Sequence, residues 1–374
     1  MSTINNFKEP SYSIPNKMFK IEKLFQNFIV TFQKLGLFPT ENKLKPHIKI
    51  ILLCVFVMCE ILPLILMPLK LIQEPTSDQI IHTLMLTGGF FWQLLFNLNF
   101  VITRSKLMKF TQEYLKIVCE NQLAIPFVYE ACVKAKRVLK IMCILSFISV
   151  NFQVFLLPLA FGILPIPMYQ PSWTTSGFGF VLLWFYQLLL FNYAAKSAMT
   201  LVLSYVFVIL VTVYAKFLSS ELQNLSSSSN WMNEYKNLIK CIRIHLQIKK
   251  MMNDWTKIYG VIIGFMLMTL KLFVAACIFL STHGDEKLAF KESVIFSVMI
   301  LASTGYQFIP CYCGSSLLSI TENFSYDLYS SDWTDGNLKY KKAMIIFCEN
   351  LKKPISMSVF GYKKLTMEVF SEVG

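Results

Sequence analysis

Long uninterrupted apolar runs dominate the hydrophobic pattern of this chain. Crossing a bilayer core takes roughly 20 apolar residues in a helix that rises 1.5 Å per residue. Six runs reach that length, at about 48–69, 80–102, 138–160, 178–211, 258–280 and 292–318. Because none of them alternates with period two, membrane-spanning helices are favoured over barrel strands. The pattern predicts an all-α polytopic membrane protein whose fourth helix is long enough to tilt or to extend past the headgroups.

Basic residues gather on alternate connections between these runs. Of the 35 Lys and Arg residues, 30 lie in four stretches, at 1–49, 103–140, 212–257 and 319–364. The positive-inside rule then places the N-terminus in the cytoplasm. The net charge of +13 is explained by orientation in the membrane, so we expect membrane lipid around the chain and no nucleic acid partner.

The composition argues against several classes of protein. With 55% hydrophobic and only 15% charged residues, the chain is neither a soluble enzyme nor a disordered protein. Its four His residues are scattered without metal-ligand spacing, and no phosphate loop or nucleophile motif is present, so we expect no enzymatic activity, no cofactor and no metal. A G-protein-coupled receptor has its N-terminus outside, which is the opposite orientation.

Three charged residues, Glu60, Lys196 and Lys271, fall within apolar runs. They could snorkel or pair inside the bundle, or Lys271 could face a ligand or a water-filled cavity. A membrane transporter or lipid-handling carrier is therefore an alternative, although paired broken helices and midplane acids are missing. A membrane-embedded enzyme is a further alternative, which the lack of a His/Asp site disfavours.

The C-terminal third carries the most specific motifs. A Ser/Thr/Glu-rich passage contains Tyr329, Ser331 and Trp333, and apolar residues with helical spacing follow at 338–351. Pro354 should end or kink that helix. A Leu-Thr-x-Glu-x-Phe sequence then occupies 365–370.

These motifs resemble those of the insect odorant receptor family. The Tyr-x-Ser-x-Trp core, the Lys-Lys-Pro turn at 352–354 and the Leu-Thr-x-Glu-x-Phe sequence stand at the family's spacing. The ending typical of the related gustatory receptors is not seen. The resemblance implies a seven-transmembrane chemoreceptor bundle, located in the plasma membrane of a sensory neuron dendrite.

The resemblance also implies a function. In this family, tuning subunits bind volatile odorants and assemble with a shared odorant co-receptor into tetrameric, non-selective, ligand-gated cation channels. The co-receptor has a much longer connection between its fourth and fifth helices than the one at 212–257 here. The chain is therefore identified as a tuning subunit.

The resemblance divides the chain into four parts. Residues 1–47 form a cytoplasmic N-terminal segment, 48–318 the six transmembrane helices of the ligand-binding bundle, and 319–355 a cytoplasmic anchor region for subunit contacts. Residues 356–374 begin the seventh, pore-lining helix. Because the sequence ends at Gly374, that helix is expected to be truncated, and the family's gate residues have no matching positions.

A volatile ligand calls for an apolar pocket with one or two polar groups. The resemblance places it in the outer halves of the helices, where the candidates are His82, Thr83, Leu86, Phe90, Phe147, Val150, Asn151, Val154, Phe185, Tyr186, Met268 and Leu272. Asn151 and Tyr186 are favoured because polar groups in apolar runs are costly unless they are paired. The candidates for subunit contact are Tyr329, Trp333, Ile346 and Phe347. A cap within the same subunit is the alternative role for this region.

Overall fold

A computed structural model gives the arrangement of the helices. It describes isolated positions from 55 to 117, Tyr169, and the ranges 61–70, 124–151, 177–225, 231–283 and 286–372 without 332 and 335. The predicted segment 1–47 lies outside the described residues, as do parts of the first three apolar runs.

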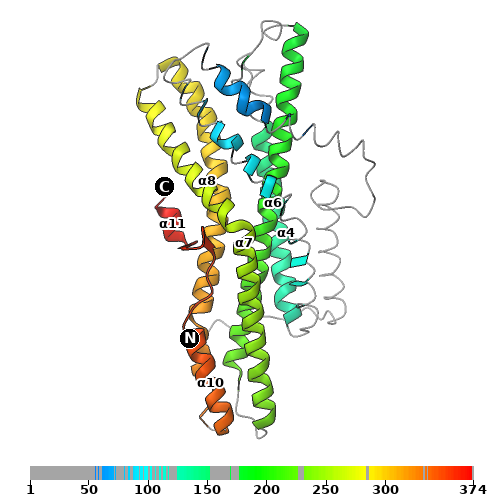
Figure 1. Ribbon diagram of the computed structural model, residues 1–374, viewed down its shortest axis with the longest axis vertical. Coiled ribbons are helices and arrows are strands. Elements are labelled where there is room, and N and C mark those ends of the chain that lie inside the picture. The colour runs from blue at the N-terminus through cyan, green and yellow to red at the C-terminus, as the bar shows by residue number, and fades with distance from the viewer. Residues whose placement is uncertain are drawn as a thin grey trace, which may run out of the picture.

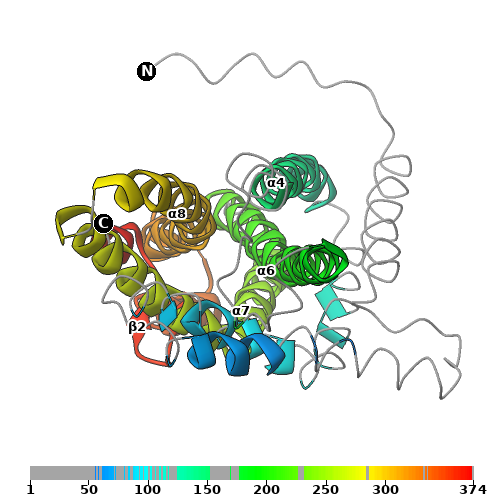
Figure 2. The same cartoon turned by 90° about the horizontal axis from the view of Figure 1, so that it is seen from above.

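Four long helices lie side by side in an elongated bundle (Figures 1 and 2). They are α4 (Ile125–Asn151), α6 (Gly177–Gln223), α7 (Trp231–His283) and α8 (Glu286–Glu322). The predicted long fourth helix is α6, whose 47 residues extend roughly 70 Å at the α-helical rise. The stretch at 212–257, which hydropathy presents as a connection, is mostly helix because α6 and α7 both continue through it.

The C-terminal part folds at the lower end of the bundle and then returns upward (Figure 1). It contains α9 (Phe324–Tyr329), α10 (Leu338–Leu351), a hairpin of β1 (Ser358–Val359) and β2 (Lys363–Lys364), and α11 (Met367–Ser371). The strands are antiparallel, with Ser358 opposite Lys364. In the predicted segment 356–374, helix therefore begins only at Met367, after the hairpin.

The predicted helix at 338–351 is α10, and its ends follow local chemistry. The side chain of Asn337 accepts a hydrogen bond from the backbone N–H of Lys339 at 2.9 Å, which satisfies one of the first free donors of the helix. The helix stops at Leu351, three residues before Pro354, whose ring disfavours continuation of a helix.

The core lies where α4, α6, α7 and α8 meet. Tyr205, Tyr214 and Trp255 are each at most 1% exposed. The indole N–H of Trp255 on α7 donates to the carbonyl of Ser204 on α6 at 3.2 Å. The described stretch Ser204–Gln223 is long and apolar enough to cross a membrane, but 67% of it is buried. Its apolar character therefore serves packing between helices.

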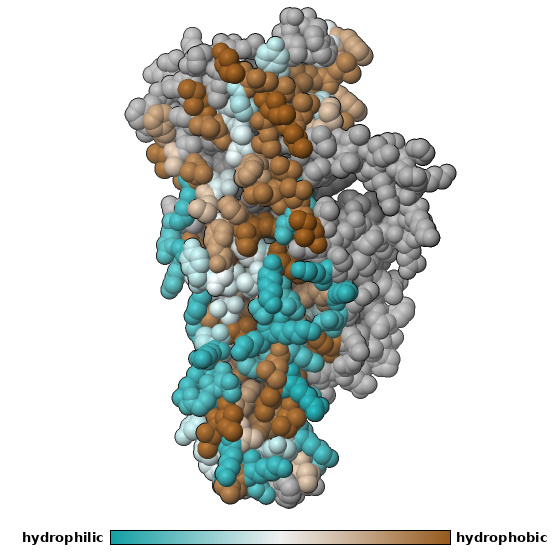
Figure 3. All heavy atoms as spheres, viewed as in Figure 1, coloured by the Kyte–Doolittle hydropathy of each residue, from teal (hydrophilic) through white to brown (hydrophobic). Residues whose placement is uncertain are grey.

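The upper half of the bundle exposes apolar side chains (Figure 3). Ile72, Phe178, Leu272 and Leu301 are each at least 70% exposed. Charged and polar residues cover the middle and lower parts, where apolar residues form separate patches (Figure 3). An apolar exterior of this extent suits a surface that lies against lipid.

Candidate ligand-binding and subunit-contact regions

Three of the predicted ligand-binding residues lie partly or fully inside the upper half. Thr83 is buried and Phe90 is half-buried. Tyr186 on α6 is also half-buried, and its hydroxyl donates to the carbonyl of Met58 at 2.7 Å. This bond ties α6 to the first apolar run, as expected for a polar group that needs a partner in an apolar setting.

Three other candidates lie on the surface of the single chain. Phe185, Met268 and Leu272 are 53%, 56% and 70% exposed, so they do not line an enclosed cavity within this subunit. Phe147, Val150 and Asn151 lie on α4, whose backbone is described there while their side chains are not. His82, Leu86 and Val154 lie outside the described residues. These assignments stay predictions.

Buried amides form a second group that the sequence reasoning missed. Gln187 is fully buried on α6, and Gln307 on α8 is 1% exposed. The Nε2 of Gln307 donates to the carbonyl of Met266 on α7 at 3.1 Å, while its Oε1 has no hydrogen-bond partner among the described residues. The argument that selected Asn151 applies equally to these amides, because each is a polar side chain within an apolar run.

The lower end of the bundle holds a polar cavity of about 400 Å³. It is lined by Lys216, Ser219, Gln223, Ile320, Asn323, Tyr326 and Asp327. Asp327 on α9 is buried, and its carboxylate accepts hydrogen bonds from Ser219 and, at 2.7 Å, from Gln223 on α6. The buried carboxylate of Asp327 connects α6 to α9.

The Tyr-x-Ser-x-Trp motif builds a turn after α9. The hydroxyl of Ser331 donates to the carbonyl of Leu328 at 2.7 Å. The indole N–H of Trp333 donates to the carbonyl of Tyr329 at 3.2 Å. Both bonds cap the end of α9 within one chain, while the Tyr329 ring itself is 64% exposed. Trp333 is half-buried against the core.

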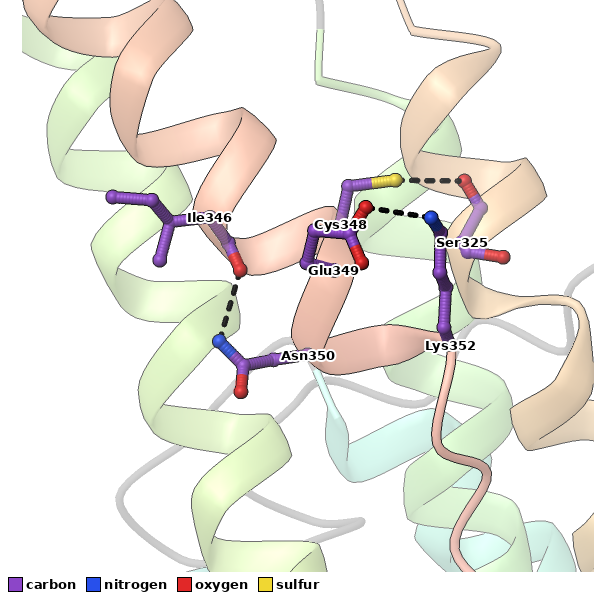
Figure 4. A network of polar contacts seen from close by, with 6 residues as sticks. All are labelled: Ser325, Ile346, Cys348, Glu349, Asn350 and Lys352. Atoms are coloured by element: carbon purple, nitrogen blue, oxygen red, sulfur yellow. Dashed lines mark hydrogen bonds and ion pairs between the residues drawn. The ribbon is translucent and has the colours of Figure 1, made fainter.

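Neighbouring residues of α10 face opposite ways. Ile346 is 65% exposed, whereas Phe347 is 4% exposed with its ring 5.6 Å from that of His245 on α7. In Figure 4, Cys348 points toward Ser325 of α9, and Ile346 projects from the other side of the helix. Phe347 is therefore occupied within its own chain, and Ile346 is open to a partner.

His245 is a buried titratable group in this lower region. It lies between the rings of Phe324 and Phe347, at 6.3 and 5.6 Å. Burial, together with the charge of nearby Lys249, lowers the pKa of His245 to about 4. Its imidazole is therefore neutral at physiological pH and acts as an aromatic packing group.

Comparison with known proteins decides the family. The family model described as 7tm Odorant receptor matches residues 77–374, which is most of the chain. The chain belongs to the insect odorant receptor family. It is a multi-pass membrane receptor and not an enzyme.

The curated relatives of this receptor are distant. It is 19% identical to Odorant receptor 85f of Drosophila melanogaster over 139 residues, which cover 37% of this chain and 34% of the relative. It is 23% identical to Odorant receptor 22b over 167 residues, which cover 43% of this chain and 40% of the relative. It is 20% identical to Odorant receptor 85b over 211 residues, which cover 56% of this chain and 53% of the relative. The matches thus span between about a third and a half of these relatives.

The fold of the receptor is shared with a solved structure. The olfactory receptor OR5 from Machilis hrabei superimposes with a TM-score of 0.79 over 96% of each chain, at 13% identity. The structure of the same receptor in complex with eugenol superimposes with a TM-score of 0.79, again over 96% of each chain, at 14% identity. The predicted all-α, seven-transmembrane chemoreceptor architecture is confirmed.

Proposed function

We propose that this receptor is the tuning subunit of an odorant-gated, non-selective cation channel. It binds a small volatile apolar ligand within its transmembrane bundle and assembles with the odorant co-receptor. It lies in the plasma membrane of sensory dendrites, with a cytoplasmic N-terminus. The observation that carries the proposal is the odorant receptor family match over residues 77–374.

The upper half of the bundle supports ligand binding. Pockets for small molecules are mostly apolar and contain a few polar groups that fix orientation. Thr83, Gln187 and Gln307 are buried polar side chains within apolar helices, and the related OR5 has been solved with eugenol. We retain as the proposed ligand site the candidate residues other than the exposed Phe185, Met268 and Leu272, with Asn151 and Tyr186 as its polar groups.

The lower part supports assembly with a different subunit. The helices α6 and α7 are joined by residues 224–230, which leaves no room for the long connection expected of a co-receptor. Apolar side chains are exposed at Tyr326, Tyr329 and Ile346, and exposed aromatic and aliphatic groups are the usual anchors of protein interfaces. We propose this surface as the co-receptor contact, and residues 356–374 as the segment that leads through the hairpin into the pore-lining helix, which begins at Met367.

The test is co-expression of the receptor with the co-receptor in oocytes under voltage clamp. A panel of volatile alcohols, esters and terpenoids, together with eugenol, is applied to each subunit alone and to the pair. We expect cation current from the pair that the co-receptor alone does not give. Solute uptake by this receptor alone, with no evoked current from the pair, would instead support the transporter alternative.

A further inference from the structure

The C-terminal hairpin, Met357–Leu365, packs directly against the backbones of α7 and α8. It is closed by the Leu365 N–H, which donates to the carbonyl of Met357 at 2.9 Å. A Cβ placed on Gly260 of α7 would lie 2.8 Å from the carbonyl oxygen of Ser358. A Cβ on Gly314 of α8 would overlap the carbonyl oxygen of Leu365. Glycine at these positions lets the hairpin approach more closely than any side chain would permit.

Phe360 is the part of the hairpin that fills the space beside α7. Gly264 lies one turn after Gly260 on the same face of the helix, and a Cβ there would overlap the Phe360 ring. The Phe360 ring also meets Phe265 edge to face at 5.5 Å. Phe360 has a φ of +53°, a left-handed conformation that a bulky residue adopts only when its surroundings hold it there. The contact between Phe360 and Gly264 is therefore a tight fit that fixes the hairpin.

The short helix α11 is attached to α8 in the same way. Its first backbone N–H, from Met367, donates to the hydroxyl of Ser315 on α8 at 2.8 Å. Its own N-cap residue, Thr366, makes no side-chain cap bond among the described residues. The Phe370 ring meets Phe308 of α8 edge to face at 5.6 Å. The neighbouring helix thus supplies the N-terminal cap of α11.

We propose that this hairpin is the link through which α7 and α8 position the C-terminal helix, with Phe360 seated against Gly264 as the positioning residue. The inference rests on the proposed function in one respect, namely that ligand binding shifts α7 relative to α8. Closely packed interfaces pass such shifts on because they cannot deform continuously. A displacement of α7 or α8 is therefore carried into α11.

The first test replaces single glycines in the full-length receptor. Gly264→Ala and Gly314→Ala should displace the hairpin, whereas a Cβ at Gly305 of α8 would meet no described atom within 4 Å. Gly305→Ala is therefore a matched control. Because alanine favours helices over glycine, a loosened hairpin in the first two variants must come from steric overlap.

The structural readout is trypsin cleavage of the purified receptor after Lys363 and Lys364, located by mass spectrometry. It does not depend on channel activity. We expect Gly264→Ala and Gly314→Ala to raise the cleavage rate about tenfold, because overpacking raises the equilibrium population of the opened hairpin by about that factor. We expect Gly305→Ala to leave the cleavage rate unchanged. Equal rates in all three variants would refute the tight fit.

The functional readout is current from the pair with the co-receptor at matched surface expression, using eugenol or the most potent volatile of the panel. We expect about a tenfold change in half-maximal concentration for Gly264→Ala, and partial restoration when Phe360→Leu is added to it. Wild-type currents in Gly264→Ala, or strictly additive effects of the two substitutions, would overturn the positioning role. If the wild-type pair gives no current, the proposed function fails, and the cleavage rates alone decide whether the hairpin is fixed as described.

Discussion

Asp327 should be a main support of the lower region, and replacing it with alanine tests this. The substitution removes a buried carboxylate that accepts hydrogen bonds from Ser219 and Gln223. A hydrogen bond to a charged group contributes about 1.5–3 kcal/mol to stability, so losing two would cost about 3–6 kcal/mol. Both donors also line the polar cavity, where water can satisfy them and offset part of that loss. We therefore expect a net cost of about 2–4 kcal/mol.

The assay is the thermal midpoint of the detergent-solubilised receptor, measured as loss of the monodisperse peak in size-exclusion chromatography. A cost of that size should lower the midpoint by about 3–8 °C in a chain this long. Asp327→Asn keeps the shape and one acceptor oxygen, so it should lose about half as much. Glu349→Gln is the matched control, because its ion pair with Lys352 is 62–64% exposed and exposed pairs contribute little.

One result would refute the reasoning. If Asp327→Ala shifts the midpoint no more than Glu349→Gln does, the carboxylate does not connect α6 to α9. If Asp327→Asn lowers the thermal midpoint as much as Asp327→Ala does, the negative charge of the carboxylate, and not its number of acceptor oxygens, holds the helices together.

Further predictions concern the ligand region and the lower part of the receptor. Tyr186→Phe removes the hydrogen bond to Met58 and should shift odorant potency about two- to tenfold, as should Asn151→Ala, without loss of assembly; unchanged dose–response curves would contradict this. Trp333→Ala removes an indole that caps α9 and should reduce co-purification with the co-receptor, whereas intact co-purification would count against a contact role. Because the pKa of His245 is lowered to about 4, the stability that its burial contributes is full above pH 6.5 and falls between pH 6.5 and 4, where the unfolded chain binds the proton and the folded chain does not. His245→Phe should remove that part of the acid-induced fall in thermal midpoint; an unchanged pH profile would exclude His245 as its source.

Local signals predicted the helices well. The extent of α10 was predicted from apolar spacing and a following proline, which lie within one stretch of sequence. Hydropathy failed where a helix leaves the membrane: α7 continues unbroken from Trp231 to His283, but its first half is too polar to resemble a span. A hydropathy scale measures the preference for lipid, and helical structure in the polar half is held by packing.

The side-chain environments could not be predicted in the same way. Ile346 and Phe347 are adjacent and both apolar, yet one is exposed and the other packs against His245. Tyr186 was selected as a polar group in an apolar run, while its neighbour Gln187, which is fully buried, was missed. Helical spacing defines an apolar face, but the structure of the neighbouring elements decides which part of that face is covered.

Helix α8 makes polar contacts both with α7 in the apolar bundle and with the C-terminal helix α11. In the apolar bundle, Gln307 of α8 donates to the carbonyl of Met266 on α7. Eight residues later, or about 12 Å along the helix, Ser315 caps α11. Pro310 lies between these two positions, and a proline inside a helix removes one backbone hydrogen bond and favours a kink. The extent to which a shift of α8 at Gln307 reaches the cap of α11 therefore depends on how the helix accommodates Pro310.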